Sequence, residues 1–258
     1  MILGLYDSGL GGLTVLAALR RAGIDRDIVY FADQAHVPYG DKTDAQIHGY
    51  LEENLALLGE LGVDAVVTAC NTTCAVAERH GWPATTFPVL DLIATAGAAF
   101  AGTPHRHIGV VATAATVRSG AYTRAIRAAA PHAAVTELAA PALVPLVERG
   151  EAETLAAREA VEAVVAQLPP DIDALVYGCT HYPLLDRWFA QALGARIERI
   201  DPAVAQAAAA QRLVAGGRLT PGTSSTTYYT NGDADAFERA VRSWTGDMTG
   251  RVAALISR

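Results

Sequence analysis

Two cysteines of this chain follow short apolar runs and precede polar residues. Cys70 stands in the stretch ACNTTC and Cys179 in the stretch YGCTHYP. A free cysteine in a protein is most often a small buried hydrophobe. The polar residues directly after each of these two favour a functional site over core packing. A cysteine in such a site can be a metal ligand, a nucleophile or a proton-transfer base.

These chemistries make different demands on the neighbouring residues. A zinc site would need four ligands, and the candidates are Cys70, Cys74, Cys179 and His181. Only one residue separates the last two, which is a poor match to the usual ligand spacings. Nucleophilic catalysis by Cys179 next to His181 would give no chemical role to Cys70. A pair of thiols that act as acid and base on opposite faces of one carbon uses both cysteines. Such a reaction inverts a stereocentre and has a bell-shaped pH profile, because one thiolate and one thiol are needed together.

The two cysteines lie at matching places of an internal repeat. Residues 64–72, DAVVTACNT, match residues 173–181, DALVYGCTH, and each stretch delivers a cysteine six residues after the aspartate. Residues 3–9, LGLYDSG, also resemble residues 108–114, IGVVATA. Ligands of open parallel sheets bind at the carboxyl ends of the strands. The repeat therefore predicts two α/β halves that present their cysteines to one site.

Short apolar runs alternate with helix-like segments along the whole chain. The strands that this pattern predicts are 2–6, 28–32, 65–68, 108–111, 135–138, 175–177 and 197–200. Asp44 is the predicted cap of a helix in which apolar residues recur at positions 47, 51, 55 and 58. Helices are also predicted from Thr73 and from Leu184, so each thiolate would gain from a helix N-terminal dipole. Alternating strands and helices predict parallel sheets covered by helices on both faces.

Composition limits the class of protein. The chain has 258 residues, of which 18% are charged and 51% hydrophobic, as in an ordinary globular protein of one or two domains. Twenty basic and twenty-seven acidic side chains give a formal net charge of −7, which argues against nucleic acid or an anionic membrane as the partner. Three cysteines do not make a disulfide framework, and no apolar run is long enough to span a membrane. We therefore expect a cytoplasmic protein with reduced thiols.

The glycine-rich loop DSGLGG, residues 7–12, fails to match the common phosphate-binding motifs. Thr14 stands where GxGxxG needs its third glycine, and no GKS or GKT occurs in the chain. Neither a dinucleotide cofactor nor a nucleoside triphosphate is therefore expected. Asp7, at the end of the first predicted strand, remains a candidate polar residue of the site.

Seven stretches together resemble the glutamate racemase family of the aspartate/glutamate racemase group. They are DSGLGGLTVL (7–16), YFADQAHVPYGDKT (30–43), ACNTTCA (69–75), IGVVATAATVRSGAY (108–122), LVPLVERGE (143–151), ALVYGCTHYPLL (174–185) and TNGDADAFERAV (230–241). The stretches run in family order over nearly the whole chain. The pair CNT and GCTHYP is highly specific, and the histidine after GCT is more similar to glutamate racemases than to aspartate racemases.

The resemblance implies racemisation of L- and D-glutamate without a cofactor or a metal. It makes Cys70 and Cys179 the two acid/base thiols, the first acting on D-glutamate and the second on L-glutamate. Asp7 and His181 would assist their proton transfers. The substrate contacts that the resemblance implies are Asp7, Ser8, Tyr39, Gly40, Asn71, Thr72, Thr180 and His181. Racemisation of aspartate or of another α-substituted acid by the same thiols is the alternative reaction.

The resemblance also implies an α/β fold of two pseudo-symmetric, doubly wound parallel-sheet domains with the active site in the cleft between them. Residues 1–93 and 207–258 would form one domain, and residues 94–206 the other. The D-glutamate product would supply peptidoglycan synthesis, and with it the cell wall and cell shape. The expected partners are the small-molecule substrate and a second copy of the chain in a homodimer.

Four positions depart from the family pattern. Ala94 and Thr95 stand where family members usually carry Glu-Pro, after the strand near 89–93, so a supporting carboxylate is missing there. Ala140 replaces a common cysteine, and Cys74 stands where a serine or alanine is usual. None of these departures touches the paired thiols.

Overall fold

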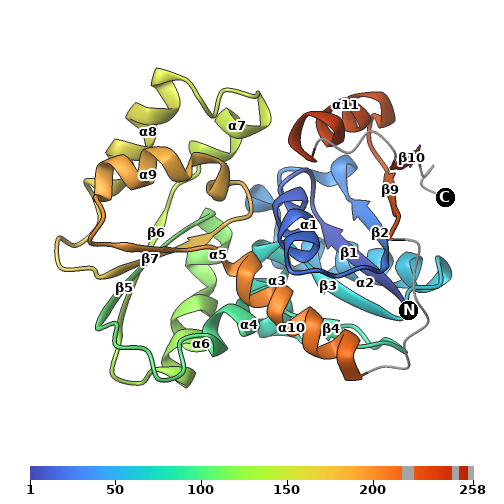
Figure 1. Cartoon of the computed structure of the whole chain (residues 1–258), viewed down its shortest axis with the longest axis horizontal. Coiled ribbons are helices and arrows are strands. Elements are labelled where there is room, and N and C mark those ends of the chain that lie inside the picture. Colours follow the sequence, from blue (N-terminus) through green and yellow to red (C-terminus); the bar gives the residue numbers. More distant parts are fainter. Residues whose placement is uncertain (217–223, 246–249, 255–258) are drawn as a thin grey trace.

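Two β-sheets, parallel throughout, carry the fold. Among the residues that the computed structural model describes, which are 1–216, 224–245 and 250–254, the larger sheet has six strands in the order β10-β9-β2-β1-β3-β4. The smaller sheet has, in the same ranges, four strands in the order β6-β5-β7-β8. We call the larger sheet with its helices the first lobe and the smaller sheet with its helices the second lobe. Figure 1 shows the first lobe on the right and the second on the left.

The strand and helix bounds follow the chain as a β/α alternation. The strands of the first lobe are β1 (Ile2–Asp7), β2 (Asp27–Ala32), β3 (Ala65–Thr68), β4 (Val89–Leu90), β9 (Thr226–Thr230) and β10 (Arg251–Ala254). The strands of the second lobe are β5 (His107–Ala112), β6 (Ala134–Ala139), β7 (Ala174–Gly178) and β8 (Glu198–Ile200). The helices of the first lobe are α1 (Gly12–Arg21), α2 (Asp44–Glu60), α3 (Asn71–His80) and α11 (Ala234–Thr245). The helices of the second lobe are α5 (Ala114–Ser119), α6 (Ala121–Ala129), α7 (Leu143–Glu148), α8 (Leu155–Val165) and α9 (Asp186–Leu193). Short 3-10 helices lie at Gln34–His36, Tyr39–Asp41 and Tyr182–Leu185.

The two sheets share a core of four strands in the same order. Strands β2-β1-β3-β4 of the first lobe correspond to β6-β5-β7-β8 of the second. The register agrees as well, because Leu3 pairs with Ala65 in one sheet as Ile108 pairs with Ala174 in the other. The predicted fold class, two pseudo-symmetric parallel-sheet units, is confirmed.

The aspartates that open the two halves of the repeat make equivalent contacts. Asp64 accepts a hydrogen bond from the backbone N–H of Ile2, at 2.6 Å, just where β1 begins. Asp173 accepts one from the backbone N–H of Arg106, at 2.7 Å, just before β5 begins. Each aspartate thus aligns the start of the neighbouring strand, which explains why DAVV and DALV share more than a hydrophobic run.

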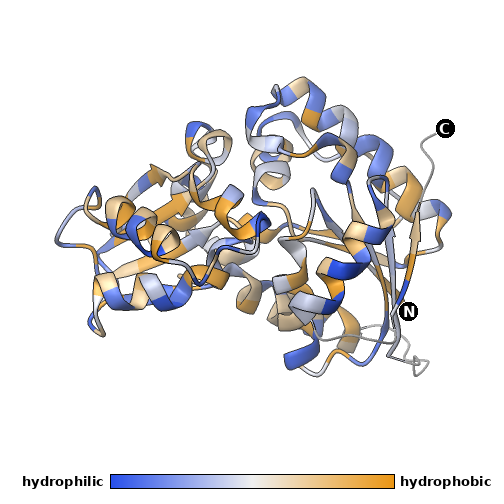
Figure 2. Ribbon diagram, turned by 90° about the horizontal axis from the view of Figure 1, so that it is seen from above, coloured by the Kyte–Doolittle hydropathy of each residue, from blue (hydrophilic) through white to orange (hydrophobic). Residues whose placement is uncertain are grey.

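The central strands are buried on both faces. Every residue of β3 and of β7 is buried, and so are most residues of β1 and β5. Their sequences are therefore continuous apolar runs rather than alternating ones. Figure 2 shows hydrophobic residues along the strands and the inner helix faces, with hydrophilic residues toward the outside.

The strands predicted from the sequence are all present, with ends that differ by at most one residue. Strands β9 and β10 were missed, because TTYYT and RVAA lack the long apolar run of a central strand. They are strands because β9 pairs with β2 and β10 pairs with β9 at one edge of the larger sheet. Strand β4 has two residues, which is too short for a periodic signal.

The predicted cap of α2 was wrong by one residue. Thr43 is the N-cap, and its side chain accepts a hydrogen bond from the backbone N–H of Gln46, while the Gln46 side chain accepts one from the N–H of Thr43. This is a capping box, in which the first helical residue needs no capping role of its own. Asp44 is that first residue. The apolar positions expected in this helix, Ile47, Leu51, Leu55 and Leu58, are buried as predicted.

Two helices lie between the lobes (Figure 1). They are α4 (Leu92–Ala98) and α10 (Pro202–Gly216), and they pack against each other. The predicted domain boundaries, after residues 93 and 206, fall inside these two helices. The division into 1–93 plus 207–258 and 94–206 stays a prediction. Within it, residues 217–223, 246–249 and 255–258 lie outside the described ranges.

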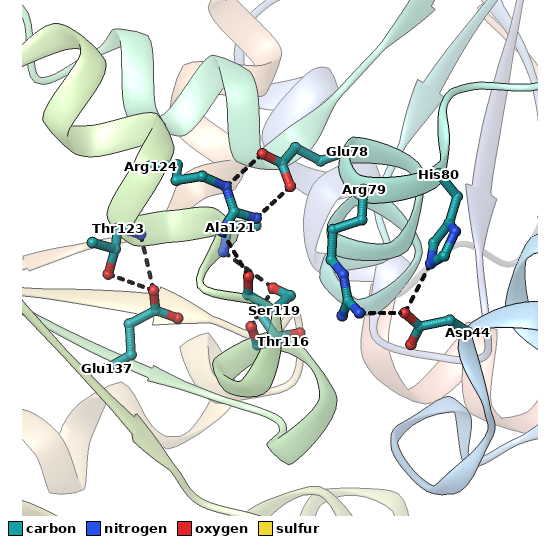
Figure 3. A network of polar contacts seen from close by, with 10 residues as sticks. All are labelled: Asp44, Glu78, Arg79, His80, Thr116, Ser119, Ala121, Thr123, Arg124 and Glu137. Carbon is teal, nitrogen blue, oxygen red and sulfur yellow. Dashed lines mark hydrogen bonds and ion pairs between the residues drawn. The ribbon is translucent and has the colours of Figure 1, made fainter.

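An ion pair also joins the lobes. Glu78 on α3 accepts two hydrogen bonds from the Arg124 guanidinium on α6, at 2.7 and 2.5 Å (Figure 3). Arg124 donates a further hydrogen bond to the carbonyl oxygen of Ser119. Both charged side chains are more than a third exposed, so solvent screening leaves the pair a small contribution to stability. Within the described ranges, none of the helices has the length and apolarity that a bilayer-spanning segment requires.

Candidate active site

One cavity between the lobes receives both cysteines. Cys70 follows β3 and Cys179 follows β7, and these two strands occupy equivalent places in the two sheets. The cavity has a volume of about 170 Å³. This is below the roughly 300–1,000 Å³ of pockets that take drug-sized ligands, so the cavity suits a small metabolite. Every residue predicted for the site lines it: Asp7, Ser8, Tyr39, Gly40, Cys70, Asn71, Thr72, Cys179, Thr180 and His181.

The thiol of Cys70 is buried at the start of α3, where Cys70 is the N-cap residue. Burial, together with the negative charge of Asp7, raises the pKa of this thiol to about 11. Hydrogen bonds with Thr73 and Ser8 act in the opposite direction. The gain that the sequence predicted from the helix start is therefore outweighed by burial. The thiol of the unliganded protein carries its proton at neutral pH.

The carboxylate of Asp7 is held by the glycine-rich loop. Its Oδ2 accepts hydrogen bonds from the backbone N–H groups of Gly9 and Gly12, at 3.0 and 2.9 Å. A Cβ at Gly12 would lie 2.6 Å from the Asp7 Cβ, so the close approach requires a glycine. Burial raises the pKa of Asp7, although the charge of His181 and the two N–H groups lower it. The DSGLGG loop thus serves a carboxylate of its own chain rather than a phosphate.

The second cysteine has a histidine beside it. The Cys179 sulfur lies 3.7 Å from Nδ1 of His181, and Nε2 of His181 lies 2.5 Å from a carboxylate oxygen of Glu148 on α7. Burial lowers the pKa of His181, but hydrogen bonds with Cys179 and Glu148 outweigh it and raise the pKa to about 10. The ring of Trp244 packs edge-on against the imidazole, 6.1 Å away between centroids. An imidazolium at this place can stabilise a neighbouring thiolate.

The helix predicted after Cys179 is different from the one expected. A short 3-10 helix, Tyr182–Leu185, follows first, and α9 begins only at Asp186. The dipole of an α-helix therefore acts on Cys70 but not in the same way on Cys179, since the effect is confined to the first turn. For Cys179, the positive charge that can stabilise the thiolate comes from His181.

Glu148 is one residue of this site that the sequence analysis did not single out. It belongs to the matched stretch LVPLVERGE, to which no role was assigned. The internal repeat indicated that a second carboxylate had to come from elsewhere, because the position of Asp7 corresponds to Ala112 in the second lobe. The second thiol thus lacks a carboxylate at the equivalent strand end. Helix α7 supplies one, and Glu148 reaches the thiol through His181.

Thr113 is a second cavity residue that was missed. It occupies the place of Ser8 in the repeat, and the match of LGLYDSG to IGVVATA could have identified it. Its hydroxyl lies 3.1 Å from the hydroxyl of Thr72 in the first lobe and 3.0 Å from that of Thr116 in the second. Hydroxyl groups of both lobes therefore meet at the cavity.

The departures from the family pattern lie away from this cavity. Cys74 is fully buried and its sulfur lies 3.1 Å from the hydroxyl of Thr68. It is not part of the cavity lining, and no group of three or more His, Cys, Asp or Glu side chains among the described residues could hold a metal ion. Ala94 lies on a separate hollow with Asp91 and Arg124. A carboxylate at position 94 would face that hollow and not the thiols.

The fold and the site together define a two-lobed α/β enzyme with acid–base groups around a small cavity. The chain belongs to the Asp/Glu/Hydantoin racemase family, whose model matches residues 14–210. It is therefore an amino-acid racemase, an isomerase.

Individual relatives agree with this placement. The chain is 42% identical to a glutamate racemase of Gloeobacter violaceus over 95% of its own length and 92% of that protein. A crystal structure of a glutamate racemase isoform from Bacillus anthracis superposes with a TM-score of 0.90 at 28% identity, covering 98% of this chain and 97% of that one. A glutamate racemase from Francisella tularensis in complex with D-glutamate superposes with a TM-score of 0.87 at 25% identity, covering 98% and 96%. The resemblance found in the sequence is confirmed.

Proposed function

We propose that this racemase interconverts L- and D-glutamate, with Cys70 and Cys179 as the two acid/base groups. The observation that carries the proposal is that the two thiols, from equivalent strand ends of two lobes, line one small cavity. A single base would need only one of them. The choice of glutamate rests on the names of the relatives and on the histidine after GCT.

Each direction of the reaction uses the thiols in opposite roles. From L-glutamate, the Cys179 thiolate takes the α-proton and the Cys70 thiol gives its proton to the other face of the carbanion. The product is D-glutamate, and the enzyme is left with a Cys179 thiol and a Cys70 thiolate. The protonated state of Cys70 in the unliganded protein is the state that this direction needs at its start.

The reverse direction needs a Cys70 thiolate, which burial disfavours. A substrate α-ammonium group that enters the cavity brings a positive charge beside Cys70 and Asp7, and a nearby opposite charge favours the ionised thiol. Asp7 would assist the first thiol, as His181 would assist the second. The groups proposed to hold the substrate are Ser8, Tyr39, Gly40, Asn71, Thr72 and Thr180 together with Asp7 and His181.

An assay in D₂O tests the proposal. Either enantiomer of glutamate, supplied alone, is expected to racemise with one deuterium at Cα of each product molecule, because the returning proton comes from a thiol that has exchanged with solvent. The same assay on L- and D-aspartate tests the alternative substrate. Racemisation without deuterium in the product would exclude the two-base reaction, and a preference for aspartate would exclude glutamate as the main substrate. Activity is expected to persist in a chelator.

Replacing Asp7 with asparagine is expected to lower the pKa of Cys70 below about 11, because it removes the nearby negative charge while the burial of the thiol remains. The measurement is the rate at which iodoacetamide alkylates the Cys70 peptide, followed by mass spectrometry across about pH 7 to 11, since only the thiolate reacts. Racemase activity should fall in the same variant. An alkylation profile that does not move would contradict the coupling between the two groups.

Three further expectations rest on the sequence and its family resemblance alone. They are the use of the D-glutamate product in peptidoglycan synthesis, a cytoplasmic location and a homodimeric state. They remain predictions, and none of them is needed for the chemistry proposed here.

A further inference from the structure

Asp33 is a fully buried carboxylate outside the chemistry described above. It follows β2 directly and precedes residues 37–41, which line the cavity. Its hydrogen-bond donors are Nδ1 of His36 at 2.7 Å, the Tyr39 hydroxyl, Nδ2 of Asn54 at 3.1 Å and Nδ2 of Asn231 at 2.5 Å. A buried carboxylate is costly unless such donors surround it, so the group requires its partners in place.

The donors come from three separate parts of the chain. His36 and Tyr39 belong to the turn that leads into the cavity, and Asn54 lies on α2. Asn231 lies between β9 and α11, in the C-terminal part of the chain. Asp33 therefore ties the turn to a helix on one side and to the C-terminal segment on the other.

The anchored turn is the one that presents Tyr39 and Gly40 to the cavity. The Tyr39 hydroxyl points into the protein, where it donates to Asp33 and lies 2.8 Å from the hydroxyl of Tyr6. What Tyr39 offers to the cavity is then its ring and its main chain, together with Gly40. The place of these groups in the cavity is set by what holds the hydroxyl, which is Asp33.

The side chain of Asn231 makes two hydrogen bonds that hold the turn. Its Nδ2 donates to Asp33, and its Oδ1 accepts the backbone N–H of Ala35 at 2.9 Å. An amide is suited to this place because it offers a donor and an acceptor at once. No alanine, aspartate or leucine could make both contacts.

The neighbours of Asn231 fit the same turn closely. The Thr230 hydroxyl donates to the side-chain oxygen of Gln34 at 2.9 Å and accepts the N–H of Gly232 at 3.0 Å. A Cβ at Gly232 would lie 2.7 Å from the Cβ of Gln34, so the two segments approach as closely as a glycine permits. We call residues 230–232, TNG, the C-terminal clamp. They open the matched stretch TNGDADAFERAV, for which the proposed chemistry has no use.

We propose that the C-terminal clamp positions the substrate-binding turn through Asp33, which makes Asn231 a positioning residue for the racemase reaction. This inference rests on the proposed function. Asn231 is not part of the cavity lining, so it acts only through Asp33 and the turn. A segment about 200 residues away in the sequence thereby sets the affinity for substrate.

The experiment compares Asn231→Ala with Asp233→Ala in the full-length enzyme. Asp233 lies two residues further on and caps α11, where its Oδ1 accepts the N–H of Ala236 at 2.9 Å. Asn231→Ala is expected to raise KM about tenfold for both enantiomers with kcat changed less than about threefold, because a displaced turn weakens ground-state and transition-state binding alike. Asp233→Ala is expected to lower the melting temperature and leave KM unchanged. Equal rises of KM in both variants, or none in Asn231→Ala, would overturn the proposal.

A second measurement does not depend on the reaction. Amide hydrogen exchange of residues 36–42, without substrate, is expected to be faster in Asn231→Ala than in the wild type, and unchanged in Asp233→Ala. If the wild type does not racemise glutamate, the proposed function fails and the exchange rates still test the clamp. If the wild type is active while neither KM nor exchange responds to Asn231→Ala, the clamp proposal fails alone.

Discussion

Alanine in place of Cys179 or of Cys70 is expected to lower kcat/KM by about 10²–10⁴-fold, because a general acid–base group contributes roughly that much and neither thiol can replace the other. The fall should be the same for L- and D-glutamate. The two enantiomers have equal free energies, so the equilibrium constant is one and kcat/KM must change equally in both directions. Circular dichroism of the substrate follows the reaction from either side.

The third cysteine gives the control. Cys74→Ser changes a buried thiol that forms a hydrogen bond with the Thr68 hydroxyl and does not line the cavity, so activity should stay close to that of the wild type. Melting temperatures of all three variants show whether the loss is one of chemistry or of folding. Activity above about a tenth of the wild type in Cys179→Ala would contradict an essential role for that thiol, since a loss of tenfold is too small for an acid–base group.

The single-thiol variants also test which face each cysteine serves. Cys70→Ala keeps the Cys179 base, so it is expected to exchange the α-proton of L-glutamate with solvent deuterium and to leave D-glutamate unlabelled. Cys179→Ala should show the opposite preference. Labelling of the same enantiomer by both variants would contradict the assignment of faces.

The sequence was enough to predict where these thiols lie, because strand ends in parallel sheets follow from local patterns. Cys70 and Cys179 come at the same offset from Asp64 and Asp173, and both aspartates align the start of a neighbouring strand in the structure. Equal offsets in two equivalent sheets place the cysteines at equivalent edges. One cavity with two thiols follows from that repetition.

The groups that tune the thiols could not be predicted in the same way. Glu148 stands in VERGE, which is typical of a solvated helix end, and it acts only because α7 packs over His181. The helix start at Cys70 is visible in the sequence, but the burial that raises the pKa of its thiol depends on residues distant in the chain, such as Tyr39 and Ile47, that pack in the same cluster. Asn231 and Asp33 are about 200 residues apart, and nothing local to either predicts their contact.

Glutamine in place of Glu148 is expected to lower kcat/KM by about 10–100-fold. This is the usual loss when a residue that orients an active-site group, and keeps it charged, is replaced. The carboxylate is one of the groups that raise the pKa of His181 to about 10 against the effect of burial. Glutamine keeps a hydrogen-bond partner for Nε2 and removes the charge. The pKa of His181 should therefore fall from about 10 toward its ordinary value of 6.5, while the hydrogen bond with Cys179 continues to raise it.

The direction of the pH effect follows from that shift. In the wild type His181 stays protonated until the pH approaches about 10, so its charge is constant through the neutral range. In Glu148→Gln it loses its proton at a lower pH, and kcat/KM is expected to fall as the pH rises through the neutral range. The raised pKa also stabilises the wild type fully below about pH 6.5, and this stabilisation is lost as the pH rises through about 10. The melting-temperature difference between the two proteins should shrink over the same range.

A carboxylate three residues further on provides the matched control for this prediction. Glu151 forms an exposed ion pair with Arg149 and does not line the cavity, so Glu151→Gln removes the same charge without reaching His181. Its pH profile should coincide with that of the wild type. If Glu151→Gln shifts the profile as Glu148→Gln does, the effect is one of overall charge. If neither variant shifts the pH profile, the charge of His181 does not depend on Glu148. Cys179 then works without a carboxylate, although Cys70 has Asp7 at the position that corresponds to Ala112.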